Sequence, residues 1–205
     1  MPNGWMLVDV DTQVDFMEPT GSLYVPGAET LYPRLRELVA MAVAAGAPHL
    51  ATMDTHTPDD PEFAAYGFPP HCVKATAGWA KVEATRPLGP YLVLSEADLA
   101  AERREQVFLK DTFDIFTNPL FRRAIALHAP RTAVVCGVAT DYCVKAAVLG
   151  LLAAGVAVVV AEDAIAAVQA ESGEAAIVEM KAAGARFLPV AAIREQLMEE
   201  AAHVA

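Results

Sequence analysis

Short apolar runs alternate along this chain with longer, alanine-rich stretches whose apolar residues recur at helical spacing. This alternation is typical of βα units, in which parallel strands form a sheet that helices cover on both faces. It therefore predicts an α/β fold with a mostly parallel sheet of about six strands. The predicted strands are Trp5–Val10, Pro48–Met53, Gln106–Leu109, Ala133–Cys136, Val156–Ala161 and Arg186–Val190.

Capping residues and glycines mark the boundaries of the predicted helices. Asn118 followed by Pro119 is a favourable N-cap and first-turn pair for a helix that runs to His128. Helical spacing also predicts helices over 30–45 and 171–183, and each of these stretches ends before a glycine.

Three other segments have a distinct character. Residues 15–27 are rich in glycine and proline, and residues 54–90 are longer than an ordinary connection. The longer segment holds too many aromatic residues for a disordered linker, so we expect an ordered lid or binding loop. Ser95 and Asp98 form a capping-box pattern that predicts a helix to about Arg104.

The size and charge of the chain exclude several classes of partner. With 205 residues, the chain is expected to form one domain over residues 1–205. Its 15 basic and 26 acidic side chains give a net charge of −11, which repels phosphate backbones and anionic lipid heads. We see no signal peptide and no apolar stretch of about 20 residues, and three cysteines are too few for a disulfide framework. We therefore expect a cytoplasmic protein that acts on a small molecule and binds neither nucleic acid nor membrane.

Four reactive side chains lie at or just beyond the carboxyl ends of four different predicted strands. They are two carboxylates, an ammonium and a thiol: Asp11, Asp54, Lys110 and Cys143. Each alone has an ordinary structural explanation, such as a helix cap, a solvated lysine or a core cysteine. Because open parallel sheets bind ligands at this edge, their joint placement predicts an active site there.

Cys143 is the best candidate nucleophile. It is expected near the start of a helix capped by Thr140, where backbone N–H groups stabilise a thiolate. Lys110 nearby would lower the pKa of the thiol. Cys136 lies inside a predicted strand and is expected to be a core residue, whereas Cys72 could lie near the site without acting in it.

Asp11 is the candidate acid or base. It closes the first predicted strand, so its carboxylate could face the thiol and carry its proton. His49, His128 and His203 sit before a strand, at a helix end and at the C-terminus, where structural or solvated histidines are expected. No Ser-His-Asp or Cys-His arrangement therefore competes with the aspartate.

A second group combines two histidines with two carboxylates. Its members are Asp54, His56, Glu62 and His71. Asp-x-His at a strand end places two ligands at one point, and a returning loop could add the other two. This set of nitrogen and oxygen donors suits Zn, Mn or Fe. Asp59 or Asp60 could replace Glu62 as the ligand, because the whole loop is acidic.

These segments together resemble the isochorismatase-like cysteine hydrolases, and within them the nicotinamidases, from Leu7 to Val190. The similar motifs occur in family order. They are Asp-x-Gln-x-Asp-Phe at 11–16, Asp-Thr-His at 54–56, Pro-Pro-His-Cys-Val at 69–73, Val-Phe-Leu-Lys at 107–110 and Gly-Val-Ala-Thr-Asp-Tyr-Cys-Val at 137–144.

The resemblance implies the isochorismatase-like hydrolase fold and a triad of Asp11, Lys110 and Cys143 that acts on an amide carbonyl. In such enzymes the thiolate adds to the carbonyl, ammonia leaves, and water hydrolyses the thioester. The resemblance also implies an oxyanion hole of backbone N–H groups near Ala139 and Cys143, and a cis peptide bond between Val138 and Ala139.

For the nicotinamidases, the resemblance implies conversion of nicotinamide to nicotinate and ammonia, a step of NAD salvage. It implies a divalent metal, zinc first with Mn or Fe as alternatives, and no organic cofactor. The matching metal positions are Asp54, His56, Glu62 and His71. The matching ring pocket is formed by Phe16, Phe68 and Tyr142, with part of the 113–116 segment. Glu62, Phe68 and Tyr142 stand where His, Trp and His are common in nicotinamidases.

Two rival functions remain open at this point. One is another carbon–nitrogen hydrolase of the same superfamily, metal-free, that acts on a carbamoyl or ureido compound or another small amide. The other is a non-catalytic binding protein, because function does not follow from fold. Family members commonly associate, so a homo-oligomer is also expected.

Overall fold

A parallel sheet with β1 (Trp5–Val10) at its centre organises the protein. The computed structural model describes residues 4–87, 91–100 and 102–202, and within them the sheet has seven strands in the order β3-β4-β2-β1-β5-β6-β7. Every neighbouring pair runs parallel. The other strands are β2 (His49–Asp54), β3 (Tyr91–Leu92), β4 (Glu105–Lys110), β5 (Thr132–Val138), β6 (Ala157–Ala166) and β7 (Arg186–Leu188).

The predicted α/β fold is confirmed, since all six predicted strands are present and parallel. The short edge strand β3 adds a seventh that was not predicted, although residues 91–94 form a short apolar run. The last strand ends at Leu188 instead of the predicted Val190. Pro189 follows it and has no N–H to donate to a neighbouring strand, and α7 (Val190–Ala202), which was not predicted, begins directly after it.

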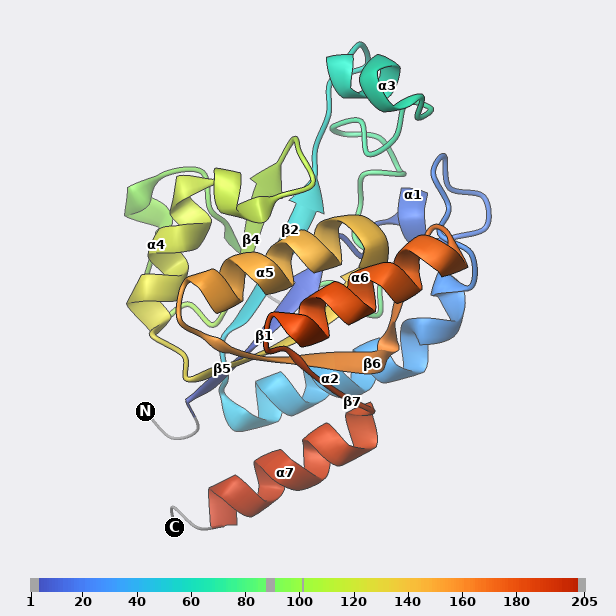
Figure 1. Cartoon of the computed structure of the whole chain (residues 1–205). Coiled ribbons are helices and arrows are strands. Elements are labelled where there is room, and N and C mark those ends of the chain that lie inside the picture. The colour runs from blue at the N-terminus through green and yellow to red at the C-terminus, as the bar shows by residue number, and fades with distance from the viewer. Residues whose placement is uncertain (1–3, 88–90, 101, 203–205) are drawn as a thin grey trace.

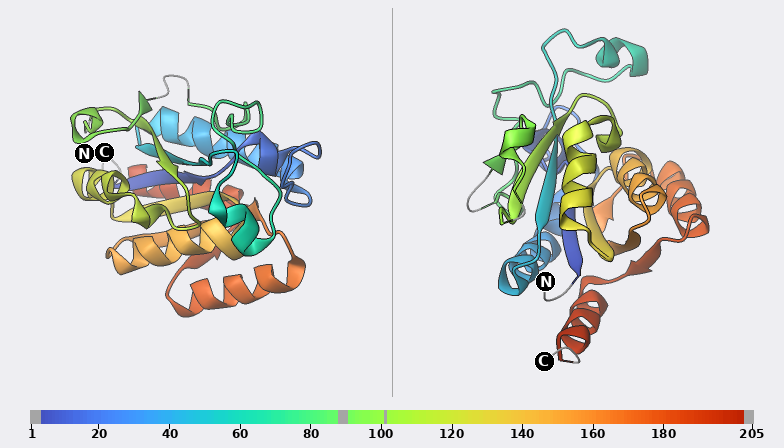
Figure 2. Two further views of the ribbon diagram at one scale, coloured as in Figure 1. Left: turned by 90° about the horizontal axis from the view of Figure 1, so that it is seen from above. Right: turned by 90° about the vertical axis from the view of Figure 1, so that its left-hand side faces the viewer.

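Helices cover both faces of the sheet, as the right-hand view of Figure 2 shows. On one face lie α2 (Tyr32–Ala45) and α7, and on the other lie α4 (Pro119–His128), α5 (Lys145–Ala153) and α6 (Ala170–Ala182). Alternate residues of β1 point into the two resulting cores, because successive side chains of a strand face opposite ways. Met6 and Val8 belong to the core under α4, α5 and α6, and Trp5 and Leu7 to the core under α2. None of the described helices is long and apolar enough to span a membrane.

Local capping fixed several helix ends where the sequence predicted them. The Asn118 side chain accepts a hydrogen bond from the Leu120 N–H at 2.9 Å, and α4 covers Pro119–His128 as predicted. The helix predicted over 30–45 consists of a 3-10 turn (Ala28–Leu31) and α2, which ends before Gly46.

The helix predicted from Ser95 to Arg104 is wrong. Ser95 and Asp98 do form a capping box, but it closes only a 3-10 turn over Glu96–Asp98. Leu99 already has extended backbone angles of −77° and 121°, so the chain leaves the helical path one residue after the box.

The long segment after β2 stands beyond the carboxyl edge of the sheet, where α3 (Pro61–Tyr66) projects at the top of Figure 1. It was expected to be ordered, and it has a defined path as far as residue 87, whereas residues 88–90 lie outside the described residues. Two isolated bridges hold it: His56 pairs with Val73 within the segment, and Lys81 pairs with Gln13, which lies shortly after β1. The segment therefore closes over the ends of β1 and β2.

The order of the strands reverses at β1, which has β2 on one side and β5 on the other. Ligand crevices of open α/β sheets form at such a point, outside the carboxyl ends of the strands. Gly137 near the end of β5 has a φ of 112°, and a Cβ there would lie 2.0 Å from the Val10 carbonyl oxygen. Only glycine therefore lets the turn after β5 approach the end of β1 so closely.

Candidate active site

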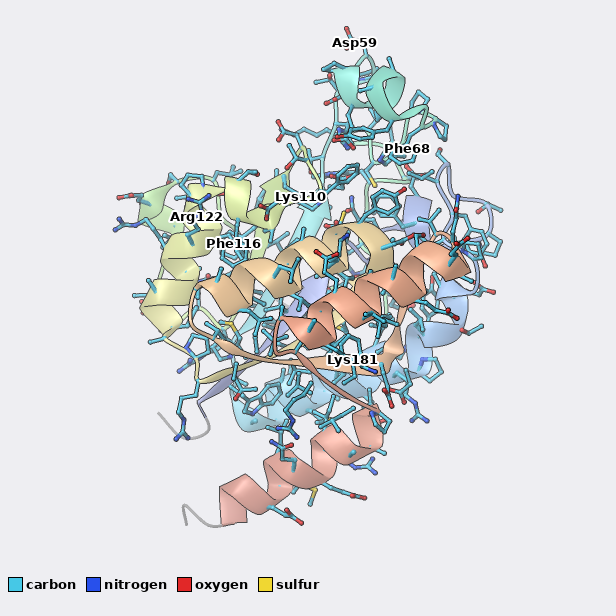
Figure 3. The ribbon with its side chains drawn as sticks, viewed as in Figure 1. Asp59, Phe68, Lys110, Phe116, Arg122 and Lys181 are labelled. Atoms are coloured by element: carbon cyan, nitrogen blue, oxygen red, sulfur yellow. The ribbon has the colours of Figure 1, made fainter. Side chains whose placement is uncertain are left out.

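Three of the four predicted strand-end side chains meet at this crevice. The Lys110 Nζ lies 2.8 Å from Asp11 Oδ2 and 3.5 Å from the Cys143 Sγ. These residues follow or end β1, β4 and β5, and all three are buried. Figure 3 shows Lys110 at the carboxyl end of its strand, below the segment that carries α3. The structure thus brings together an acid, an ammonium and a thiol from separate parts of the sequence.

Asp11 is held in an uncommon backbone conformation. Its φ of 48° lies in the left-handed region, which aspartate adopts more readily than most residues. The Thr52 hydroxyl donates to Asp11 Oδ1 at 2.6 Å and accepts from the Asp11 N–H at 3.1 Å. These two bonds fix both the main chain and the carboxylate of Asp11, and they leave Oδ2 for Lys110.

Lys110 also contacts the fourth predicted residue, Asp54, with Nζ 3.0 Å from Asp54 Oδ1. Burial by itself would lower the pKa of Lys110, but the carboxylates of Asp11 and Asp54 raise this pKa well above its ordinary value. Lys110 therefore remains a buried ammonium that links the two carboxylates.

Cys143 lies in a single wide turn of π type over Thr140–Val144, between the end of β5 and the start of α5. The expectation that Thr140 caps its helix is wrong, because Ala139 takes the cap position and no side chain bonds the turn there. The Val138–Ala139 peptide bond is cis, at the position that the resemblance implied. The turn thus places the Cys143 backbone and side chain directly after this bond.

Asp141 ties this turn to the neighbouring helix α6 and was not singled out in the sequence. Its carboxylate accepts hydrogen bonds from the Val168 N–H at 3.0 Å, the Gln169 N–H at 3.3 Å and the Ser172 hydroxyl at 2.6 Å. Nothing local marks Asp141 for this role, since its partners lie 27 to 31 residues away.

The Cys143 thiol is not preactivated by its surroundings. Burial raises its pKa well above the ordinary value; Lys110 acts in the opposite direction, while Asp11 and Asp54 add to the increase. The expected lowering by Lys110 is therefore outweighed. The free protein holds Cys143 as a neutral thiol whose proton needs an acceptor, and Asp11, which bonds the thiol, is the nearest base.

This raised pKa makes a testable prediction about chelator-treated protein. Alkylation of Cys143 by iodoacetamide should be slow at about pH 7 and should still be increasing with pH above about 8.5, where an ordinary thiol is already half ionised, because only the thiolate reacts. Mass spectrometry of the modified peptide, with Cys143→Ala as the control, measures the rate at each pH. A rate that is already maximal near about pH 7 would contradict the prediction.

The other two cysteines have no comparable setting. Cys136 is fully buried in β5, and burial raises the pKa of its thiol, as expected for a core residue. Cys72 is also fully buried, burial raises its thiol pKa, and its N–H donates to Asp15 Oδ2 at 2.7 Å. His49 and His128 are buried outside the pocket described below, and His203 lies outside the described residues.

Asp54, His56 and His71 form a compact group that could hold a metal ion. One ligand atom of each lies within 4.8 Å of the others, and all three residues are buried. Asp54 Oδ2 is 3.0 Å from the His56 Nε2 and 3.4 Å from the His71 Nε2. Burial by itself would lower the pKa of His56, but Asp54 and Asp60 raise this pKa to about 9, so the group favours a positive charge at this point. A buried set of nitrogen and oxygen donors with this preference fits a divalent cation.

The three carboxylates that could complete this group differ in their positions relative to the His56 ring. Glu62 Oε1 lies 3.9 Å from the His56 Nε2, the nitrogen that faces Asp54. Asp60 Oδ2 lies 3.0 Å from Nδ1 on the other side of the ring. Asp59 is exposed at the outer tip of the segment, away from the strand ends, as Figure 3 shows. Glu62 therefore lies on the same side of the His56 ring as Asp54, and Asp60 lies on the opposite side.

A single pocket connects the thiol with the metal-type group. It is lined by Cys143, His71 and Asp54 together with all three residues predicted for the ring pocket, Phe16, Phe68 and Tyr142. The remaining lining residues are Leu23, Val25, Phe113, Ala139 and Val168. Leu23, Val25 and Val168 were missed, because isolated apolar residues in connecting segments carry no sequence signal.

Aromatic rings form one wall of this pocket. The centroid of the Phe113 ring lies 5.2 Å from that of the Tyr142 ring, at a tilted angle, and 6.4 Å from that of the Phe68 ring, edge to face. Tyr66 from α3 adds a ring 4.9 Å from Phe113. The pocket thus offers flat apolar surface to a planar ring and buried polar groups at its inner end.

Comparisons with known proteins agree with this geometry. The Isochorismatase domain model matches residues 6–192. The pyrazinamidase of Pyrococcus horikoshii, solved in complex with zinc, is 28% identical with a TM-score of 0.76, over 91% of this chain and 99% of that one. PnC1 from L. infantum, solved in complex with nicotinate, is 29% identical with a TM-score of 0.73, over 94% and 96%.

A more distant neighbour shares the fold alone. N-carbamoylsarcosine amidase from Thermoplasma acidophilum is 23% identical with a TM-score of 0.73, over 91% of this chain and 96% of that one. No curated protein sequence is similar enough to this chain to count as a match.

Proposed function

This chain belongs to the isochorismatase family of hydrolases, and from that membership we propose that it hydrolyses nicotinamide to nicotinate and ammonia. The observation that carries the proposal is the pocket that Cys143 lines together with Asp54 and His71, two members of the Asp54–His56–His71 group. The similarity to a zinc-bound pyrazinamidase and to a nicotinate-bound protein, both above 25% identity, supports an aromatic amide as the substrate.

In the proposed reaction Asp11 moves the protons. Its carboxylate takes the thiol proton as Sγ of Cys143 bonds to the amide carbon, and the carbonyl electron pair moves onto oxygen. Backbone N–H groups of Ala139 and Cys143 donate to this oxyanion. Asp11 then gives its proton to the amide nitrogen, the C–N bond breaks, and ammonia leaves a thioester on Cys143.

Water completes the cycle. It loses a proton to Asp11 as it attacks the thioester carbon, the C–S bond then breaks, and the proton returns to the sulfur. Lys110 keeps its positive charge throughout, since its pKa is raised well above the ordinary value, and it stabilises the ionised forms of Asp11 and Cys143 in turn.

The metal-type group would bind a divalent cation through Asp54, His56 and His71, with Glu62 as the fourth ligand. Zinc suits these donors, with Mn and Fe as alternatives. Such a cation would supply Lewis acidity toward the pyridine nitrogen of the substrate. The chain's own contribution is to orient the ligands, and the His71 Nδ1 is held by the Pro69 carbonyl at 2.9 Å for this purpose.

Ammonia release from nicotinamide tests the proposed function directly. Zinc-loaded protein should release ammonia, and His56→Ala should lose both the bound zinc and, by at least about a hundredfold, the activity. Asp59→Ala is the matched control, because this exposed carboxylate lies outside the ligand group. The protein could instead release no ammonia from nicotinamide, while its metal-free form is fully active on an acyclic ureido compound. That result would replace the proposal with the rival function, a metal-free carbon–nitrogen hydrolase.

Asp60 allows a test of the ligand arrangement that needs no substrate. In the wild-type protein the Glu62 N–H donates to Asp60 Oδ1 at 3.0 Å, and Asp60→Asn keeps an acceptor for this bond. The substitution removes the negative charge next to the His56 Nδ1. Zinc affinity is expected to fall about tenfold, because a carboxylate behind a ligating histidine strengthens its binding. Competition with a zinc-binding dye measures this, with Asp59→Asn as the control. Equal affinities for the two variants would exclude the role of Asp60.

A further inference from the structure

A second buried ion pair lies close to the catalytic group and takes no part in the proposed chemistry. Lys81 Nζ is 2.9 Å from Asp9 Oδ2, with side-chain exposures of 4% and 0%. Asp9 is the only charged residue of β1, a strand that is otherwise apolar. Burial by itself would raise the pKa of Asp9, but the Lys81 ammonium holds this pKa below its ordinary value. The other titratable groups at this point are His49, with Nε2 3.6 Å from Asp9 Oδ2, and Cys136, which interacts electrostatically with both charges.

Such a pair calls for an explanation beyond stability. Two buried charges lose their hydration, and apolar residues of similar size are often at least as stabilising. The contacts of the two side chains show what the charges hold in place.

On one side, Lys81 reaches the residue that orients the catalytic carboxylate. Its Nζ donates to the Thr52 carbonyl at 3.2 Å. The Thr52 hydroxyl bonds both the carboxylate and the N–H of Asp11. One residue of β2 therefore connects the ammonium to Asp11.

On the other side, Asp9 holds the residue that follows Asp11. Asp9 Oδ1 accepts a hydrogen bond from the Thr12 hydroxyl at 2.8 Å. The Thr12 carbonyl in turn accepts from the Val82 N–H at 2.9 Å, next to Lys81 in sequence. The ion pair thus fixes the main chain after Asp11, the residue with the left-handed backbone, and conformations of this kind persist only where their surroundings enforce them.

We propose that the Asp9–Lys81 ion pair is a positioning pair for Asp11: by holding Thr52 and Thr12 on either side, it keeps the Asp11 carboxylate aimed at Lys110 and the Cys143 thiol. The proposal rests on the proposed function only in that Asp11 serves there as the base. Lys81 comes from the segment that also carries the metal-type residue His71, so the pair joins the acid to the loop that closes over it.

A neutral pair separates positioning from mere stability. Lys81→Met alone leaves Asp9 as an uncompensated buried charge, and it should lower both the unfolding temperature and kcat. Asp9→Asn/Lys81→Met removes both charges together, keeps an acceptor for the Thr12 hydroxyl, and should recover most of the unfolding temperature. If the pair positions Asp11, kcat of this double variant stays about 10- to 100-fold below wild type with KM unchanged.

Wild-type kcat in a double variant of restored stability would overturn the proposal. Should that variant fail to fold, Thr52→Val provides the same test. It removes only the hydroxyl that bonds Asp11, so unchanged kcat would overturn the proposal there too.

A readout without substrate keeps this test separate from the proposed function. The alkylation rate of Cys143 depends on the base that faces the thiol, whichever amide is the substrate. The double variant should alkylate at a rate different from wild type across the pH range. If nicotinamide proves not to be hydrolysed, equal alkylation profiles would still reject the positioning role, and different profiles would support it.

Discussion

Cys143→Ala is expected to reduce kcat for amide hydrolysis by at least about a thousandfold, the largest effect of any single substitution in this protein. In the proposed reaction the Cys143 Sγ forms the thioester, so the variant lacks the nucleophile, while Asp11 and Lys110 keep their contact at 2.8 Å. Ammonia release under single-turnover conditions measures the loss. The small change in a buried side chain should leave the unfolding temperature nearly the same.

A zinc-binding measurement on Cys143→Ala shows whether the variant has lost only its nucleophile or the structure of the whole site. Cys143 is not among the three residues of the metal-type group, so Cys143→Ala should bind zinc as wild type does. Cys136→Ala, which truncates a buried cysteine elsewhere, is the matched control and should keep its activity. Substantial hydrolysis by Cys143→Ala would show that another group attacks the amide.

Lys110→Met is expected to cost about 3–5 kcal/mol of unfolding free energy in chelator-treated protein. The substitution leaves the carboxylates of Asp11 and Asp54 buried without the ammonium that lies 2.8 and 3.0 Å from them. Turnover of the zinc-loaded variant should also fall at least about a hundredfold, since Asp11 and the thiolate lose their counter-charge. Denaturant unfolding measures the stability, and Lys145→Met, with its ion pair to Glu179 near the surface, is the control that should change it by less than about 1 kcal/mol.

The stability difference between wild type and Lys110→Met should vary with pH in a defined way. The pKa of Lys110 is raised in the folded protein. The contribution of Lys110 to the free energy of unfolding is therefore complete below about pH 10.4 and is lost as the pH rises through the pKa of the folded protein. Burial by itself would raise the pKa of Asp54, but Lys110 and the two histidines lower it. The contribution of Asp54 to the free energy of unfolding is therefore complete above about pH 3.9 and is lost as the pH falls through the pKa of the folded protein. The difference should therefore shrink as the pH rises through the folded Lys110 value, and also as acidification protonates the buried carboxylates that the variant leaves without an ammonium. A difference that grows on acidification would contradict the assignment of charges.

Much of the fold was predictable because its signals are local. β1 has the boundaries that its apolar run predicted, and α4 those that Asn118 and Pro119 predicted. The exception at Ser95 is instructive, since a correct cap was followed by a chain that turned extended toward β4. A cap starts a helix, but packing of the residues after it decides how far the helix continues.

The candidate site was also predictable only in part. Asp11, Lys110 and Cys143 could be named from their places at strand ends, because a parallel sheet gathers these ends at one edge. The choice between Glu62 and Asp60 could not be made, since it depends on which side of one imidazole ring each carboxylate lies. The pKa of Cys143 was also out of reach, because burial is a property of the whole fold.

The sequence by itself determined six of the seven described strands, the candidate triad of Asp11, Lys110 and Cys143, and the edge of the sheet at which these residues gather. These features follow from periodicity, caps and connectivity, which act over a few residues or through simple topology. Only the tertiary structure decided the protonation of the thiol, the lining of the pocket and the pairing of Lys81 with Asp9. Those depend on contacts between residues dozens of positions apart, whose free energies exist only once the segments have packed together and excluded water.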